Sequence, residues 1–172
     1  TSNDLLIPLQ KGNVLTNAAD ITRQDRHAQI MYFMLIDRFK NGNKQNDKPM
    51  NRPDVNPKVD FLGGDLAGIS QEIQNNYFKK LGTNTLWISP VNQNPEEPYG
   101  YYAPKKTKFS GYHGYWPISS SKVDHRFGTN QELKDLVSTA HDKNMNVLLD
   151  YVAHHIHELH PLYKQHPEFF TS

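Results

Sequence analysis

A histidine-rich segment, DYVAHHIHELHP at residues 150–161, has the side chains best able to bind a metal or a polar ligand. It contains four of the nine histidines in the sequence: His154, His155, His157 and His160. A zinc-protease helix needs H-E-x-x-H, and Glu158 lies only two positions before His160, so that pattern is absent. On a strand, His155 and His157 would point to one side, as in metal-dependent barrel hydrolases. Taken singly, each histidine is more often a hydrogen-bonded or surface residue.

A second polar group lies in segment 37–67, which begins DRFKNGNKQND and leads into FLGGDLAG. Its side-chain oxygens, and a glycine carbonyl that no side chain obstructs, are ligands that Ca²⁺ prefers. The candidate set is Asn41, Asn43, Asn46, Asp47, Gly63 and Asp65. The segment is not an EF-hand, because no Glu occupies the twelfth position. Asn and Gly also serve tight turns, and composition alone favours turns over a calcium site.

Aromatic residues dominate a third segment, YGYYAPKKTKFSGYHGYWP at 99–117. They are Tyr99, Tyr101, Tyr102, Phe109, Tyr112, Tyr115 and Trp116. Aromatic faces edged by polar atoms suit sugar rings, whose C–H faces pack on the π-system while their hydroxyls accept and donate hydrogen bonds. The alternative is that the rings anchor a long loop to the core, and for most of the tyrosines that alternative is favoured.

Three short apolar runs are candidates for the strands that position these groups: MYFMLI at 31–36, TLWI at 85–88 and VLLDYV at 147–152. Continuous rather than alternating apolar runs are typical of strands buried on both faces of a parallel sheet. Each run is followed by a long polar or aromatic loop, beginning at residues 37, 89 and 153. Such loops are usually functional, and they leave the carboxyl ends of the strands, where parallel α/β proteins place their sites.

Helical patterns separate the runs. Before the second run, Ile69, Ile73, Tyr77 and Leu81 recur every four residues, and Gly82 is placed to end the helix. Before the third run, Thr129 and Glu132 predict a capping box, followed by an apolar stripe. The order strand, helix, strand, helix, strand predicts an α/β protein with right-handed crossovers.

Composition indicates one soluble globular unit, with 36% hydrophobic residues and a formal charge of +1. The densest basic cluster, Lys105, Lys106 and Lys108, suits a solvated loop, so a nucleic-acid partner is not expected. No apolar run approaches the roughly 20 residues that a membrane span needs. The absence of cysteine excludes disulfides and thiolate metal sites but is compatible with several compartments.

Four segments together resemble the α-amylases of glycoside hydrolase family 13. DYVAHH is similar to the first conserved region, in which an Asp on the third barrel strand leads to an Asn-His pair. GYHGYW resembles the segment whose Tyr and Trp line the sugar site, and YFKKLGTNTLWISPV the second helix-strand unit. DRFKNGN with ND, then GGDLAGI, resembles the first-strand loop that holds calcium in cyclodextrin-forming and related members. These segments occur in the family's order from about residue 30 onward.

The resemblance implies roles for particular residues. His155 would hydrogen-bond the sugar at the cleavage subsite, Tyr115 would stack on that sugar, and Trp116 would support the wall. Asp150 would orient its neighbours rather than attack the substrate. The Asn41 to Asp65 set would hold a structural Ca²⁺, which reverses the preference that composition alone gives.

The chain departs from the family pattern at two positions. His154 stands where the family usually has an Asn that offers an oxygen to a calcium ion between the barrel and its insertion, and imidazole nitrogen suits Ca²⁺ poorly. The change to His154 therefore disfavours a second calcium site. At the second position, Ser119 stands where many relatives have Asp, so local hydrogen bonding there is expected to differ.

The resemblance implies an incomplete TIM (β/α)8 barrel with the first three strands, since a whole barrel takes about 250 residues. We expect a lead-in at 1–24, barrel at 25–156 and the start of an inserted domain at 157–172. The expected parent is a secreted, periplasmic or cell-envelope enzyme that hydrolyses α-1,4-glucosidic bonds of starch-like glucans with retention. Its catalytic carboxylates would lie on later strands, so this chain alone should be inactive.

Two other functions remain open. The chain could be a carbohydrate-binding or structural module, whose exposed sheet edges would be covered by self-association or by the remainder of a barrel. Alternatively, His155 and His157 could serve a metal-dependent amidohydrolase-like barrel, although the aromatic segment would then have no role.

Overall fold

The computed structural model describes residue 7 and residues 9–16, 20 and 22–170. Its centre is a three-stranded parallel sheet formed by β3 (Met31–Met34), β4 (Thr85–Ile88) and β7 (Asn146–Leu149), in the order β3-β4-β7. The three apolar runs therefore form strands, as predicted. Two runs continue past their strands: Ile36 already begins a helix, and residues 150–152 have left the sheet.

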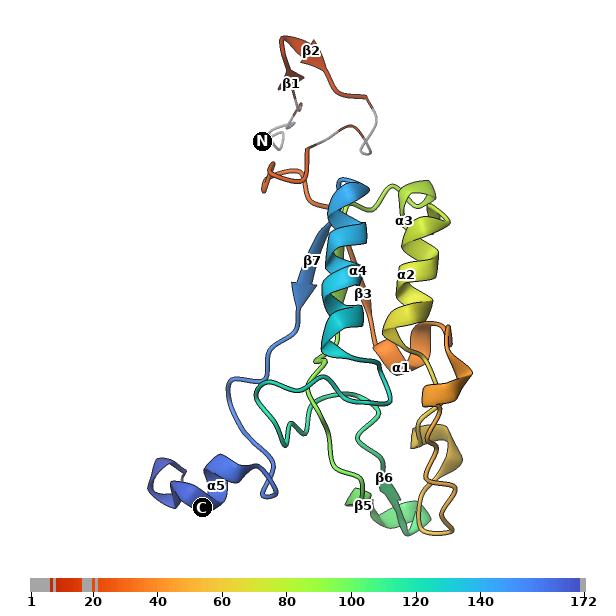
Figure 1. Ribbon diagram of the computed structural model, residues 1–172, viewed down its shortest axis with the longest axis vertical. Helices are drawn as coiled ribbons and strands as arrows, with labels where there is room; N and C mark the ends of the chain where they lie inside the picture. The colour runs from red at the N-terminus through yellow and green to blue at the C-terminus, as the bar shows by residue number, and fades with distance from the viewer. Residues whose placement is uncertain (1–6, 8, 17–19, 21, 171–172) are drawn as a thin grey trace.

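Helices cover one face of this sheet (Figure 1). The first crossover contains α1 (Ile36–Phe39), α2 (Leu66–Gln74) and α3 (Tyr77–Lys80), and the second contains α4 (Asn130–Asp142). Between the helices and the sheet lies one hydrophobic core, in which these side chains are fully buried: Ile36, Leu66, Ile69, Phe78, Leu86, Ile88, Phe127, Leu136 and Ala140. Burial of these apolar side chains is the main force that holds helices and strands together.

The N-termini of both long helices are capped by side chains. Thr129 and Glu132 form the predicted capping box at the start of α4, with both reciprocal hydrogen bonds present. Asp65 caps α2 by accepting a hydrogen bond from the Gly68 amide at 2.7 Å.

The sequence pattern predicted one helix from Ile69 to Leu81. The structure has two helices in this region instead. Asn76 has a left-handed backbone, with φ of 58°, and separates α2 from α3. Asn tolerates this conformation better than most residues because its short polar side chain can bond locally. As a result, Tyr77 and Leu81 are partly exposed while Ile69 and Ile73 are buried.

The expectation that the strands are buried on both faces is wrong for the described residues. Away from the helices, the sheet exposes Met31 (54%), Phe33 (46%), Trp87 (40%) and Leu148 (44%). Phe33, Trp87 and Leu148 form one row across the sheet, and the first two rings meet edge to face at 4.9 Å. A parallel sheet normally has a second layer over such a row, and none of the described segments supplies one.

The smaller elements belong to the connecting segments. The hairpin of β1 (Leu9–Gln10) and β2 (Asn13–Val14) lies within the predicted lead-in, most of whose remaining residues fall outside the described part of the chain. The hairpin of β5 (Tyr99–Tyr102) and β6 (Thr107–Phe109) follows β4. The remaining short helices are η2 (Lys44–Asn46), η3 (Pro57–Val59), η4 (Ala103–Lys105), α5 (Pro161–Gln165) and η5 (Pro167–Phe169). Among the helices of the described residues, we find none with the length and apolar character of a membrane-spanning segment.

The three long segments leave the carboxyl ends of β3, β4 and β7 and gather at one end of the molecule (Figure 1). The β5–β6 hairpin and the loops before α2 and α4 lie there, whereas the N-terminal hairpin lies at the opposite end. This arrangement follows from the parallel strands, because every carboxyl end then points the same way.

Candidate functional site

Tyr115, Asp150 and His155 lie together at the carboxyl end of β7. The Tyr115 hydroxyl donates to Asp150 Oδ2 at 2.6 Å, and His155 Nε2 lies 2.8 Å from the Tyr115 carbonyl oxygen. Asp150 is held in place because its amide continues the ladder to the Ile88 carbonyl of β4. Three of the four predicted sugar-binding residues are thus directly connected, although they come from two separate segments.

The contact of His155 determines which ring nitrogen is free. A carbonyl oxygen can only accept, so Nε2 must carry the hydrogen and donate it. In the neutral ring, Nδ1 is then an acceptor. His155 is exposed, and Nδ1 has no hydrogen-bond partner among the described residues, so it is available to a ligand hydroxyl.

Burial, together with the hydrogen bond to Asp150 and its negative charge, raises the pKa of Tyr115 to about 12. The hydroxyl therefore stays protonated at neutral pH and remains a donor. Tyr115 is suited to binding and orienting Asp150, and is not suited to acting as a base at neutral pH.

His113 is a site residue that the sequence patterns did not single out. Its Nδ1 accepts a hydrogen bond from the Tyr115 amide at 2.9 Å. Its ring stacks at 5.9 Å on Tyr115 and meets Trp116 edge-on at 4.5 Å. Burial, assisted by the nearby charge of Arg38, lowers the pKa of His113 to about 4. A neutral His113 thus contacts both rings, and its position two residues before Tyr115 in YHGYW was the available signal.

Trp116 is positioned by a buried polar cluster, which sequence reasoning also missed. The Trp116 amide donates to Asn94 Oδ1 at 2.9 Å, and the Asn94 amide donates to Asp124 Oδ2 at 2.9 Å. Asp124 also binds the Arg126 guanidinium through two hydrogen bonds, at 2.8 and 2.7 Å. Asn94, Asp124 and Arg126 are all buried, and Arg126 lies 4.1 Å over the Phe61 ring. Paired and hydrogen-bonded buried charges of this kind hold a long loop in one conformation.

The remaining histidines do not converge with His155. His157 packs edge-on against the Tyr99 ring at 4.2 Å. His160 is buried, lies 3.0 Å from Ser120, and caps α5 by accepting from the Leu162 amide. His154 is exposed. Within the described residues, no three His, Cys, Asp or Glu side chains are placed to share a metal ion. The geometry therefore gives no support to a site built on His155 and His157.

The calcium candidates form a compact loop around Asp65. Asp65 is fully buried and accepts hydrogen bonds from the amides of Gly42, Asn43 and Gly68 and, at 3.3 Å, from the Asn46 side chain. Its oxygens thus hold the first half of the loop against the start of α2. Asn43 is used differently from the prediction, because its Oδ1 caps η2 by accepting from the Gln45 amide.

The same loop contains two side-chain oxygens that lack a hydrogen-bond partner. Asn41 Nδ2 donates to both oxygens of Asp47, which leaves Asn41 Oδ1 buried and without a hydrogen bond; Asn46 Oδ1 is buried and unpaired as well. Unpaired buried oxygens are costly unless a cation or water satisfies them. The Gly63 backbone, with φ of 90°, packs closely against the same side chains, since an added Cβ would lie 2.5 Å from Asn41 and Asp47. The donor set fits a hard cation such as Ca²⁺.

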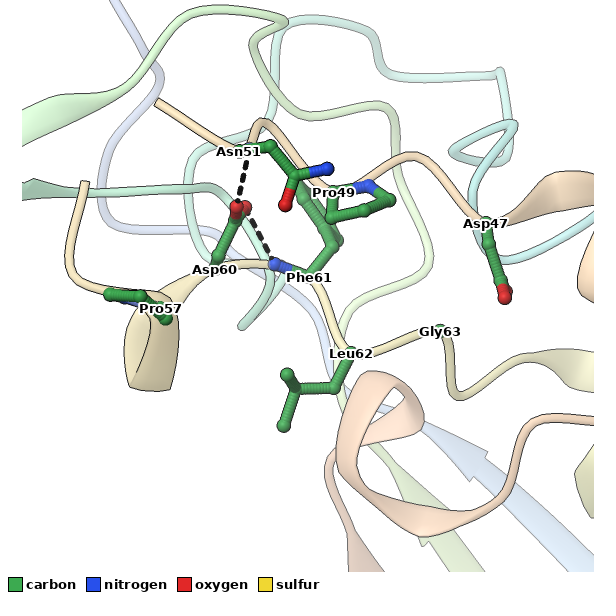
Figure 2. Close-up of a pocket in the computed structure, with 8 residues that line it drawn as sticks. All are labelled: Asp47, Pro49, Asn51, Pro57, Asp60, Phe61, Leu62 and Gly63. Atoms are coloured by element: carbon green, nitrogen blue, oxygen red, sulfur yellow. Dashed lines mark hydrogen bonds between the residues drawn. The ribbon is translucent and has the colours of Figure 1, made fainter. Parts of the chain in front are cut away.

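A hollow of about 310 Å³ adjoins this loop (Figure 2). Asp47 and Gly63 line one side of it, and Asp60 stands on the other side, where its carboxylate accepts from the amides of Asn51 and Phe61. None of the predicted sugar-binding residues lines this hollow. It is therefore associated with the calcium candidates and not with Tyr115.

The parallel strands, the helices on one face and the polar and aromatic site at the carboxyl ends define an α/β protein of the (β/α)8-barrel type. The family model described as "Alpha amylase, catalytic domain" matches residues 33–169. The chain belongs to the α-amylase family, and the predicted fold, an incomplete (β/α)8 barrel, is confirmed.

Relatives include amylases and a transferase. The chain is 33% identical over 157 residues to the periplasmic alpha-amylase of Escherichia coli K12. This match covers 90% of the chain and 22% of the relative. The chain is also 33% identical over 140 residues to the cyclomaltodextrin glucanotransferase of Klebsiella oxytoca, covering 78% and 20% respectively.

One similar crystal structure is that of the alpha-amylase of Geobacillus thermoleovorans complexed with acarbose. It is 33% identical, has a TM-score of 0.59, and the match covers 82% of this chain and 26% of that one. The chain thus spans roughly a fifth to a quarter of these relatives.

Proposed function

We propose that this chain is part of an α-amylase-type glycoside hydrolase that cleaves α-1,4-glucosidic bonds of starch-like glucans with retention. The observation that carries the proposal is the cluster of Tyr115, Asp150 and His155 at the carboxyl end of β7. It presents an aromatic ring beside a free imidazole nitrogen, which is the combination that binds a sugar by its C–H face and its hydroxyls. Family membership and the acarbose complex of the Geobacillus relative support the same substrate class.

In this proposal each residue has a separate task. Tyr115 stacks on the sugar, Trp116 forms the wall beside it, and His155 Nδ1 accepts a hydrogen bond from a sugar hydroxyl. Asp150 holds the Tyr115 hydroxyl, so it positions the ring instead of attacking the substrate. These contacts supply the orientation that lowers the barrier once the reacting groups are present.

Retaining hydrolysis needs two carboxyl groups about 5 Å apart, one as nucleophile and one as acid and then base. We place both in other parts of the whole protein, since Asp150 is already engaged by Tyr115. This chain by itself is then a binding wall without hydrolytic activity. The exposed row of Phe33, Trp87 and Leu148 is the face that the remainder of the barrel would cover.

We further propose a structural Ca²⁺ held by Asn41, Asn46, Asp47 and the Gly63 carbonyl. The unpaired oxygens of Asn41 and Asn46 support it. Asp65 would hold the loop closed around the ion through its hydrogen bonds to Gly42 and Asn43. Bound Ca²⁺ would supply the positive charge that satisfies these oxygens, so it would act on stability and not on the sugar.

A periplasmic or secreted location is proposed for the whole protein, in line with the relative named a periplasmic alpha-amylase.

The test is hydrolysis of soluble starch by the whole protein, followed by reducing-end release and by NMR of the first-formed anomer. We expect an α-anomer product, loss of most activity in His155→Ala, and near-normal activity in the matched control His154→Ala, which changes an adjacent exposed histidine. Release of no reducing ends by the wild-type protein would refute the hydrolase proposal. A β-anomer as first product would refute retention alone.

A further inference from the structure

The β5–β6 hairpin carries aromatic residues that the proposed sugar site does not use. Tyr101 and Tyr102 are 63% and 46% exposed, although a loop anchored by its aromatic rings would bury them. Tyr102 lines a hollow of about 190 Å³, separate from the Tyr115 cluster. The other residues that line it are Asn56, Val59, Lys105, Thr107 and Phe109.

An irregularity in the hairpin determines which way Tyr102 points. Tyr99 is paired with Phe109, and Tyr102 is paired with Thr107, so β5 advances three residues while β6 advances two. Such a bulge changes the alternation of side chains along one strand. Directly paired residues in an antiparallel hairpin lie on the same face, and Thr107 and Phe109 share a face because they are two apart. Tyr99 and Tyr102 therefore lie on one face, which a regular strand would not allow.

This shared face connects the hollow to the proposed sugar site. At one end, the Tyr99 ring contacts Trp116 at 6.3 Å and His157 at 4.2 Å. In the middle, Gly100 lies so close to Phe109 and Trp116 that a Cβ would be 3.2 and 3.7 Å from their rings. Tyr102 lies at the far end, about 7 Å along the hairpin from Tyr99, since the bulge makes it pair only two residues of β6 away. Aromatic surface thus continues from Trp116 through Tyr99 and Phe109 to Tyr102.

The rim of the hollow provides free polar groups. Among the described residues, neither the Lys105 ammonium nor the Thr107 hydroxyl has a hydrogen-bond or ion-pair partner. Asn56 uses its Oδ1 to accept from the Lys58 amide, which leaves its amide nitrogen available as a donor. A ring face with a few polar groups at its edge matches a sugar better than it matches a purely apolar ligand.

We propose that the hollow at Tyr102 is an additional subsite for an α-glucan chain, occupied by a glucosyl unit several positions away from the one at Tyr115. This inference rests on the proposed function, because it takes the same chain to run from Trp116 along the hairpin face. Only chains long enough to span the hairpin would reach both places. Tyr102 would then favour long glucans over short oligosaccharides without touching the reacting bond.

The test compares Tyr102→Ala with Tyr101→Ala in the whole protein. Tyr101 is the neighbouring, more exposed tyrosine and does not line the hollow. We expect Tyr102→Ala to lower kcat/KM for long-chain amylose by about five- to tenfold, the loss of one stacking contact, and to leave maltotriose hydrolysis unchanged. Tyr101→Ala should match the wild type on both substrates, and Tyr102→Phe should retain amylose activity because the ring remains.

Retardation in native gels containing amylose provides a readout that does not need catalysis. Weaker retardation of Tyr102→Ala than of Tyr101→Ala supports the subsite even if the wild-type protein hydrolyses nothing, an outcome that would refute only the proposed function. Equal behaviour of Tyr102→Ala and the wild type in both assays overturns the subsite. Equal losses in the two alanine variants overturn it as well, because the effect would then not depend on the hollow.

Discussion

The Tyr115 hydroxyl donates to Asp150 Oδ2 at 2.6 Å, which joins the aromatic segment after β4 to the end of β7. Two residues 35 positions apart thus form one unit. The ring gains its orientation from this bond and from the His113 ring stacked on it. A sugar that stacks on Tyr115 would meet a surface that is already ordered, which reduces the entropy cost of binding.

Tyr115→Phe removes the hydroxyl that donates to Asp150 and keeps the aromatic ring. We expect the variant to keep its fold and to lose about tenfold in kcat/KM on maltooligosaccharides, because one charge-assisted hydrogen bond is removed. Tyr115→Ala should lose on the order of a hundredfold, since the stacking surface is removed as well. Steady-state kinetics on the whole protein would measure both. Equal losses in the two variants would show that the hydroxyl, and not the ring, carries the effect.

His113 predicts a pH-dependent stability. Its pKa is lowered to about 4 in the folded protein, against an ordinary value of 6.5, so the unfolded state binds the extra proton first as pH falls. The stability due to neutral His113 is complete above about pH 6.5 and is lost on acidification toward pH 4. We expect about 1–2 kcal/mol of this loss between pH 7 and pH 5.

Urea unfolding of the wild type and of His113→Asn across this pH range would measure the contribution of His113 to the free energy of unfolding. Asn can still accept from the Tyr115 amide, so the variant should fold and show a shallower pH dependence. His154→Asn is the control, because His154 is exposed and should leave the wild-type slope intact. Identical slopes in the wild type and His113→Asn would contradict the assignment.

Calcium removal should lower thermal stability. A cation bound only by the folded state adds to the free energy of unfolding, so excess EGTA should reduce Tm by about 3–8 °C. Asp47→Ala should start from a lower Tm and respond little to EGTA. Asp54→Ala should keep the full response, since Asp54 is an exposed carboxylate paired with Arg52. A wild-type Tm that EGTA leaves unchanged would mean that the loop is a set of turns.

Arg126 should be far more sensitive to substitution than Arg52. Arg126→Met leaves the Asp124 carboxylate buried without its counter-charge, at a cost of about 3–5 kcal/mol. Arg52→Met removes a solvent-exposed pair with Asp54 and Glu97 and should change the unfolding midpoint little. Chemical denaturation of both variants gives the comparison. Similar midpoints would mean that the buried pair does not hold the loop.

Local features of the structure were readable from the sequence. The capping box at Thr129 and the strand at 85–88 were predicted from residue type and spacing, and both are present. The helix break at Asn76 was not predicted, because apolar spacing reports burial and not backbone conformation. The exposed row at Phe33 and Trp87 was missed for a related reason: an apolar run shows that a strand can be covered, not which segment covers it.

Four features could be deduced from the amino-acid sequence: the strands, the capping of α4, the family and the residue types that could bind a sugar or a cation. Those features depend on neighbours a few positions away, where propensity and periodicity act. Three features became visible only in the folded protein: Tyr115 binds Asp150, burial keeps His113 neutral against two rings, and Tyr102 shares a face with Tyr99. These depend on how long loops close and pack, and on one bulge in a hairpin, which no local pattern encodes.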